Sequence, residues 1–163
     1  MGSSLCASLY SIELKMALCC VNLYGPYVDK ERFWIRLFKM ECLKSSKLIL
    51  GGDLNYSVGF SEIWGVRARV DILSDFFIRK MDGFGLVDLV LTVILSTWSN
   101  RRVGCENICK RLDRSLISVD FLECNLHLRQ WIGCGGDSDH QPVFLQLLNK
   151  DVRPRNVFKF NAN

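Results

Sequence analysis

The chain has 163 residues, of which 49% are hydrophobic and 23% are charged, and its formal net charge is +4 at pH 7. This balance excludes an intrinsically disordered chain and is typical of one globular domain. The mild positive charge permits contact with phosphate backbones but is smaller than in most domains dedicated to nucleic acid.

The longest runs without a charged residue cover residues 16–28 and 89–100, and both are too short to span a bilayer. Glu13 and Lys15 interrupt the apolar stretch near the N-terminus, which argues against a secretory signal peptide. We therefore expect an intracellular protein without a membrane partner, and a nuclear location is compatible with that expectation.

The chain contains eight cysteines, and without a signal peptide a disulfide scaffold is the weaker interpretation. Those in apolar segments, such as Cys19, Cys20 and Cys42, are typical of small buried hydrophobic residues. A zinc site is the alternative, because four residues vaguely resemble zinc ligands in their spacing. These four are Cys105, Cys109, Cys124 and His127.

The first half of the chain alternates between apolar runs and helical periodicity. Residues 1–15 show no clear period, so we expect them to be irregular. The apolar run at residues 16–24 stops at Gly25-Pro26, which predicts a buried strand followed by a turn. The predicted segments that follow are a helix at 29–44, a short strand at 47–50, a surface loop at 55–65, a helix at 70–81 and extended structure at 85–91.

Apolar side chains at helical spacing define the inner faces of both predicted helices. Asp29 suits the N-cap of the first helix, and Gly83 suits the C-terminal stop of the second. Both apolar stripes are typical of core packing. Their members are Phe33, Trp34, Leu37, Phe38 and Leu43 in the first helix, and Ile72, Leu73, Phe76, Phe77 and Met81 in the second.

The second half of the chain contains a polar, aromatic loop at residues 97–102 and several predicted strands. The strands are expected at residues 112–119, 126–132 and 141–148. The alternation of strands and helices predicts a layered α/β domain over residues 16–150. Residues 151–163 are mostly polar, and we expect them to form a tail or linker.

Four polar segments interrupt or follow predicted buried strands, at residues 21–26, 51–55, 111–114 and 138–142. Buried strands rarely carry unpaired acids, because an isolated carboxylate is costly to remove from water. We therefore expect these strand ends to converge on one polar site.

Asp53 and Asn55 are two residues apart, so both side chains point to the same side if extended geometry persists. Asp53 can accept a proton or a hydrogen bond, and Asn55 can donate a hydrogen bond. The preceding glycines, Gly51 and Gly52, allow the backbone to approach a ligand closely. A plain turn without chemistry is the alternative interpretation of this segment.

Asp139 and His140 form a sharper motif. An acid beside a histidine suits a metal ligand next to a general base or a phosphate-polarising group. Asp113, in the preceding strand, is a candidate to fix the tautomer of His140. A loop contact between the two residues is the alternative.

Taken in chain order, five motifs together resemble the endonuclease/exonuclease/phosphatase superfamily. The third and fourth resemble more narrowly the endonuclease domain of LINE-type retrotransposons common in plant genomes. The resemblance covers residues 16–163 and implies a two-sheet sandwich flanked by helices. The motifs are Asn-x-Tyr-Gly-Pro at 22–26, Gly-Asp-x-Asn at 52–55, Thr-Trp-Ser-Asn at 97–100, Arg-Leu-Asp-Arg at 111–114 and Ser-Asp-His-x-Pro at 138–142.

The resemblance implies in-line hydrolysis of a DNA phosphodiester bond that leaves a 3′-hydroxyl. By this resemblance, Asp53 would orient or deprotonate the attacking water. Asn55 would bind the phosphate, Tyr24 would contact or polarise it, and Asn22 would lie near it.

The same resemblance assigns the remaining site residues. His140, paired with Asp113, would stabilise the scissile phosphate, and Asp139 would contact a divalent metal. Magnesium suits this role, with manganese as the second choice. A solvated loop is the alternative to DNA binding for residues 97–102. The DNA-binding candidates are Trp98, Asn100, Arg101 and Asn22, supported by Arg67 and Arg69.

The sequence departs from the family pattern at its N-terminal end. Family members begin with a strand bearing an Asn and another ending in a Glu that is the principal metal ligand, and neither motif precedes Tyr24. The resemblance therefore implies a fold that is incomplete at the N-terminus, a weakly held metal and weak or lost nuclease activity. It also implies an uncovered sheet edge through which the chain could self-associate.

Three other interpretations stay open at this point. The chain could be a non-catalytic remnant of the same fold that binds nucleic acid or protein. It could be a phosphatase of the same superfamily. It could also be the product of a decayed element that does not fold stably.

Overall fold

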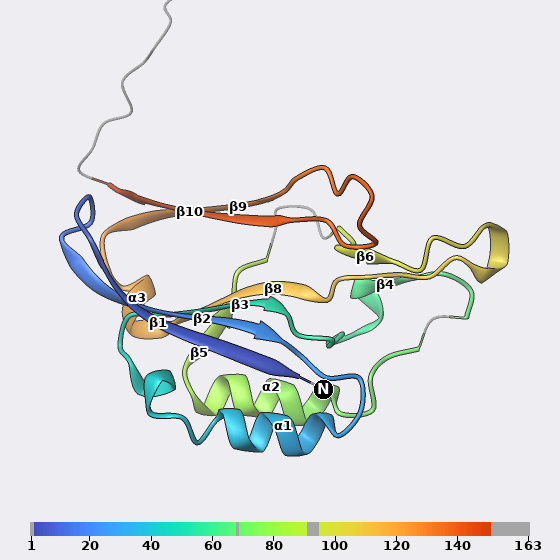
Figure 1. Ribbon diagram of the computed structural model, residues 1–163, viewed down its shortest axis with the longest axis horizontal. Coiled ribbons are helices and arrows are strands. Elements are labelled where there is room, and N and C mark those ends of the chain that lie inside the picture. The colour runs from blue at the N-terminus through green and yellow to red at the C-terminus, as the bar shows by residue number, and fades with distance from the viewer. Residues whose placement is uncertain (1, 68, 91–94, 151–163) are drawn as a thin grey trace, which may run out of the picture.

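The computed structural model describes residues 2–67, 69–90 and 95–150 of the chain (Figure 1). Its largest sheet has the strand order β1-β2-β3-β8-β5. β2 and β3 run parallel, whereas the other neighbouring strands of this sheet are antiparallel. The five strands are β1 (Ser3–Ser11), β2 (Met16–Tyr24), β3 (Leu48–Asp53), β8 (Asp113–Ser118) and β5 (Leu86–Asp88).

Two helices, α1 (Lys30–Leu37) and α2 (Ser74–Gly83), cover one face of the large sheet (Figure 1). Their apolar sides pack with residues of β2 and β3 in the main core. Trp34 is fully buried there, and its ring centroid lies 5.9 Å from that of Tyr56 and 5.1 Å from that of Phe77. Because large aromatic rings bury much apolar area, this packing stabilises the position of β3 and of the residues at its end.

The opposite face of the large sheet is covered by an antiparallel pair, β9 (Leu126–Ile132) and β10 (Val143–Asn149) (Figure 1). A second core contains Leu18 of β2, Ile117 of β8 and Leu126 of β9, with Phe121 of the short helix α3 (Val119–Leu122). The molecule is therefore layered as strand pair, large sheet and helices.

A small sheet lies beside these layers, with the order β4-β7-β6. An isolated bridge pairs Trp98 of β6 with His140, so the small sheet holds the loop that connects β9 to β10. The remaining elements are β4 (Ile63–Trp64), β6 (Trp98–Ser99), β7 (Cys109–Lys110) and the 3-10 turns η1 (Glu41–Lys44), η2 (Phe60–Glu62) and η3 (Gly104–Glu106).

The predicted α/β organisation is confirmed: the described strands form three sheets, and two helices flank the largest. The predicted strands at residues 16–24 and 126–132 have the limits of β2 and β9. The predicted strands at residues 112–119 and 141–148 correspond to β8 and β10 with small differences at their ends. None of the described helices is long and apolar enough to cross a membrane.

The N-terminal segment differs from the prediction. Residues 3–11 form β1, which pairs with β2 along its whole length instead of being irregular. The sequence signal was weak because the side chains of β1 are mostly exposed, so pairing with β2 rather than an apolar period specifies this strand. The predicted tail at residues 151–163 lies outside the described residues.

The first helix is shorter than the predicted range of residues 29–44. α1 ends at Leu37, and the chain turns through Met40, whose backbone is extended, before η1 begins. This turn lets Leu43 enter the same core as Trp34 before the chain reaches β3. Asp29 is the N-cap of α1 as predicted, but it has a φ of 55° and makes no side-chain capping hydrogen bond.

The segment at residues 55–65 is only in part the predicted surface loop, because residues 55–57 and 62–63 are buried while residues 60–61 and 64–65 are exposed. Tyr56 is fully buried, stacks on Phe77 at 4.2 Å between centroids and donates its hydroxyl to the Leu73 carbonyl. α2 begins only at Ser74, which leaves Ile72 95% exposed rather than inward.

Two further differences concern segment ends. α2 ends at Gly83 as predicted, but the residue with a left-handed backbone is Gly85, with a φ of 58°. The predicted loop at residues 97–102 contains the short strand β6.

Candidate active site

Three predicted site residues form a row across the large sheet. Tyr24 at the end of β2 is paired with Asp53 at the end of β3, and Asp53 is paired with Asp113 at the start of β8. Side chains of directly paired residues in antiparallel strands share one face of a sheet. The two carboxylates are therefore brought together by strand register, although 60 residues of sequence separate them.

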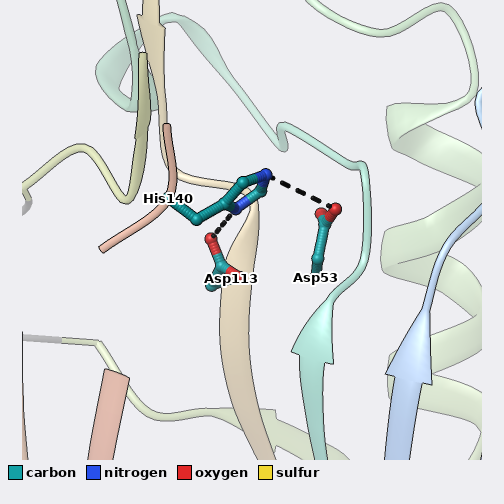
Figure 2. A group of neighbouring side chains, drawn as sticks. All are labelled: Asp53, Asp113 and His140. Atoms are coloured by element: carbon teal, nitrogen blue, oxygen red, sulfur yellow. Dashed lines mark hydrogen bonds and ion pairs between the residues drawn. The ribbon is translucent and has the colours of Figure 1, made fainter. Parts of the chain in front are cut away.

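His140 completes this group from the loop between β9 and β10 (Figure 2). Its Nδ1 lies 2.9 Å from Asp113 Oδ2, and its Nε2 lies 3.8 Å from Asp53 Oδ2. Because a carboxylate only accepts hydrogen bonds, Nδ1 carries the hydrogen of the first contact. The hydrogen bond to Asp113 raises the pKa of His140 above its ordinary value, against the opposing effect of burial.

Asp53 is the more buried of the two carboxylates, with 9% of its surface exposed. Burial raises the pKa of Asp53, the charge of Asp113 raises it further, and hydrogen bonds from Asn55 together with the charge of His140 oppose this shift. A carboxylate with a raised pKa is a stronger base toward a bound water, provided that it remains ionised.

A cleft of about 510 Å³ borders the group. Its lining includes Asp113, His140, the glycines of β3 and Cys134. Gly52 has a φ of 126°, and a Cβ at this position would lie 2.1 Å from the Leu23 carbonyl oxygen. This strand end therefore requires glycine, as its close contact with β2 demands.

Comparison with known structures identifies the fold. The endonuclease domain of TRAS1, a telomere-specific non-LTR retrotransposon, is similar with a TM-score of 0.68 and 16% identity, over 90% of this chain and 61% of that one. The 3′ phosphatase NExo from Neisseria, bound to a product DNA hairpin, is similar with a TM-score of 0.59 and 18% identity, over 79% of this chain and 60% of that one. The chain has the endonuclease/exonuclease/phosphatase fold.

The chain spans about 60% of the length of both of these structures. No protein-family model matches the sequence, and no curated protein is similar to it at a significant level. The identities are low, so these comparisons establish the fold alone.

Within this endonuclease/exonuclease/phosphatase fold, Asn55 serves Asp53 directly. Extended geometry ends at Asp53, and Asn55 has a left-handed backbone with a φ of 51°. Its backbone N–H donates to Asp53 Oδ1 at 2.9 Å, and its side-chain Nδ2 donates to Asp53 Oδ2 at 3.0 Å and to the Gly25 carbonyl at 2.6 Å. The side-chain amide that could bind a phosphate is thus engaged within the protein, and its contact with Asp53, together with that of the backbone N–H, orients the carboxylate.

Asp139 lies next to the group but has a different partner. Trp98 Nε1 donates to Asp139 Oδ2 at 2.9 Å, and the backbone N–H of Ser99 donates to the Asp139 carbonyl at 3.0 Å. The indole therefore fixes the acid that the resemblance assigns to the metal, and Trp98 positions this loop in the described structure.

The other DNA-binding candidates of the 97–102 segment also have partners within the protein. Asn100 Nδ2 donates to the Glu106 carbonyl, and Asn100 Oδ1 accepts from the backbone N–H of Ile108. Arg101 donates to the carbonyls of Gly136 and Ser138 in the loop that bears His140.

The remaining polar candidates lie at the surface. Tyr24 is 46% exposed beside Asp53, and Asn22, two residues earlier on β2, is also exposed. Arg67 forms an ion pair with Glu106 at 2.7 Å on the surface. Arg69 is exposed and does not belong to the group around His140.

Sequence reasoning missed the role of Thr97. Its side chain is 1% exposed, and its Oγ1 accepts hydrogen bonds from the backbone N–H groups of both Leu112 and Asp113, each at 2.9 Å. Thr97 therefore fixes the backbone that presents Asp113 to His140. The Thr-Trp-Ser-Asn motif contained this residue, but the sequence offered no signal that its hydroxyl would reach the start of β8.

Arg111 and Arg114 of the third polar segment are also structural. Both are 1% exposed and form ion pairs with Glu62 and Asp88, including Arg111–Glu62 at 2.8 Å and Arg111–Asp88 at 2.7 Å. Burial alone would raise the pKa of Glu62, but the hydrogen bonds and charge of Arg114 hold it below its ordinary value. These pairs anchor the two ends of the segment that carries Asp113.

Asp53, Asp113 and His140 are placed to share a metal ion, because their ligand atoms all lie within 4.8 Å of one another. In the described part of the chain, no other set of three or more His, Cys, Asp or Glu side chains meets this condition. The carboxylate oxygens of Asp53 and Asp113 fit magnesium or manganese in their chemistry, whereas the imidazole nitrogen of His140 is a donor that magnesium does not favour. Asp139 is not a member of this group. The zinc alternative fails here, because its cysteines and His127 form no such group among the same residues.

Proposed function

We propose that this chain hydrolyses phosphodiester bonds of DNA in a divalent-metal-dependent reaction, at a low rate. The observation that carries the proposal is the position of His140 between Asp113 and Asp53, at 2.9 and 3.8 Å. This arrangement supplies a base, a cation and a group that orients the cation, and the cation and its orienting group, His140 and Asp113, line the cleft.

In this reaction, Asp53 accepts the proton of the attacking water, and its raised pKa favours that acceptance. The imidazolium of His140 faces the phosphate and neutralises charge that develops on its oxygens. Asp113 keeps His140 in the tautomer with hydrogen on Nδ1 and supports its positive charge. Tyr24, at the rim, contacts the phosphate by our proposal.

Asp53 and Asp113 would hold the metal, with Asp139 as an additional ligand, while His140 keeps its proton. A bound magnesium ion would polarise a phosphate oxygen and lower the pKa of its own water. The donor set fits the ion, but each carboxylate of the group already faces the His140 ring. The ion therefore competes with the His140 imidazolium for these two carboxylates, which makes its binding weak and the reaction slow.

DNA is the proposed substrate because both structural neighbours are DNA-processing proteins by name. The net charge of +4 is compatible with a polyanion. We propose that Trp98, Asn100, Arg101 and Asn22 flank the DNA, together with Arg67 and Arg69.

Nicking of supercoiled plasmid with magnesium tests the proposal. We expect slow nicking that chelation stops and that His140→Ala and Asp53→Asn abolish. His127→Ala is the matched control, because His127 is the other histidine of the chain and lies exposed on β9. Loss of nicking in His127→Ala, or persistence in His140→Ala, would contradict the proposed site. Fast nicking that Asp139→Ala abolishes would contradict the low rate.

Two alternatives have their own tests. Hydrolysis of a terminal 3′-phosphate is favoured by the similarity to the 3′ phosphatase NExo, and release of phosphate from a 3′-phosphorylated DNA hairpin would identify it. A non-catalytic binding module would bind a DNA duplex yet show no heat on titration with magnesium in a calorimeter.

A further inference from the structure

β1 is an edge strand of unusual exposure. It occupies one end of the large sheet, and among the described strands its partner is β2 alone. Seven of its nine residues are exposed. Its sequence contains no charged residue and no proline. Charged residues and prolines are the features that normally prevent an edge strand from pairing with another chain, so β1 lacks this protection.

Apolar side chains are concentrated on this edge. Leu5 is 70% exposed and Leu9 is 50% exposed. Their positions in the register, opposite Asn22 and Leu18, place both on the same face of the sheet. Tyr10, on the other face, is 66% exposed. Water therefore contacts a strip that combines unpaired backbone groups with large apolar side chains.

Two of the four residue pairs that flank the central residue of β1 are identical. Read outward from Ala7 in Ser3–Ser11, Leu5 mirrors Leu9, and Ser3 mirrors Ser11. An antiparallel partner with the same sequence would therefore place each Leu5 opposite the partner copy's Leu9. A two-fold dimer interface requires this kind of self-complementarity, and the absence of charge in β1 avoids like-charge contacts across the axis.

From this edge we infer that two copies of the chain pair through β1, antiparallel, with Ala7 at the two-fold axis. The pairing joins the two large sheets into one continuous ten-stranded sheet. Each leucine contact replaces exposed apolar surface, and the edge backbone groups gain hydrogen-bond partners. This inference is independent of the proposed reaction, because none of its residues belongs to the group around His140.

The edge at β10 is the competing surface. Phe144 and Leu148 on it are each 45% exposed, but alternate residues of β10, such as Leu145 and Leu147, pack against the second core. β1 is longer, and its leucines are on average more exposed. The same substitutions made on β10 therefore provide a matched control.

Sedimentation equilibrium of the full chain at about 100 µM, where a micromolar dissociation constant gives mostly dimer, tests the inference. We expect twice the monomer mass of 18.7 kDa. The double variant Leu5→Lys with Leu9→Lys faces like charges across the axis and is expected to be monomeric. The variant Leu5→Lys with Leu9→Glu faces opposite charges and is expected to restore the dimer.

The control variant, Phe144→Lys with Leu148→Lys, is expected to remain dimeric. A monomeric wild-type chain would overturn the inference, and so would a dimer that survives the Lys/Lys pair. Failure of the Lys/Glu pair to restore the dimer would overturn the register, and monomers caused by the β10 control would assign the interface to the wrong edge. All β1 substitutions are at exposed positions, and circular dichroism confirms that the fold is retained.

Discussion

Replacing the Thr97 hydroxyl tests whether this residue holds Asp113 in place. In Thr97→Val, the backbone N–H groups of Leu112 and Asp113 both lose their acceptor, which lies 2.9 Å from each nitrogen. The side chain is 1% exposed, so water does not readily replace the hydroxyl. Each buried donor left unsatisfied costs about 1–3 kcal/mol, and the two donors together predict a loss of about 2–6 kcal/mol in the free energy of unfolding.

Urea unfolding measures this loss, and Thr97→Ser is the matched control because it keeps the oxygen and removes only a methyl group. We expect the control to lose about 1 kcal/mol. In Thr97→Val, NMR titration of His140 should show its raised pKa moving back toward the ordinary value, because Asp113 is less firmly placed. A valine variant as stable as the serine variant, with the pKa of His140 unchanged, would refute the reasoning.

Three further predictions follow from the same contacts. Glu62→Gln removes the negative charge that pairs with Arg114 and should lower the free energy of unfolding by about 3–5 kcal/mol at pH 7, measured by urea unfolding. Because the pKa of Glu62 is lowered, the difference in stability from wild type should shrink as pH falls below the ordinary value of 4.5. A difference that stays constant with pH would contradict this. The raised pKa of His140 stabilises the fold fully below pH 6.5, and this effect is lost as pH rises through the raised value. The difference in unfolding free energy between wild type and His140→Gln should therefore decline as pH rises from 6.5. A difference that grows with pH would contradict the pairing of His140 with Asp113. Trp98→Phe removes the hydrogen bond to Asp139, worth about 1.5–3 kcal/mol for a charged acceptor, and should tighten magnesium binding about tenfold in calorimetry; unchanged affinity would remove Asp139 from the proposed metal ligands.

The polar segments of the sequence indicated which residues would meet, but not how. The convergence of Asp53, Asp113 and His140 was predictable, because acids at the ends of buried strands require a shared polar site. The pairing of Asp53 with Asp113 depends on β3 and β8 being neighbours in the sheet. Local sequence does not encode strand order, so the 2.9 and 3.8 Å contacts of His140 required the structure.

Other roles depended on backbone conformation and burial that short motifs do not reveal. Asn55 was predicted to share a face with Asp53, but its left-handed backbone turns it onto that carboxylate. Arg111 and Arg114 belonged to a motif whose neighbours have site roles, yet their partners Glu62 and Asp88 are 23 to 52 residues away in sequence. Long-range ion pairs of this kind have no periodic signal, and β1 lacked one because it buries little.

The central claim is that Asp53, Asp113 and His140 form a phosphodiester-cleaving site. The most direct test is magnesium-dependent nicking of supercoiled DNA, which compares the wild-type chain with His140→Ala and with the control His127→Ala. The account predicts slow nicking by the wild-type and His127→Ala chains and none by folded His140→Ala. Equal nicking by all three chains, or none by a correctly folded wild-type chain, would contradict it.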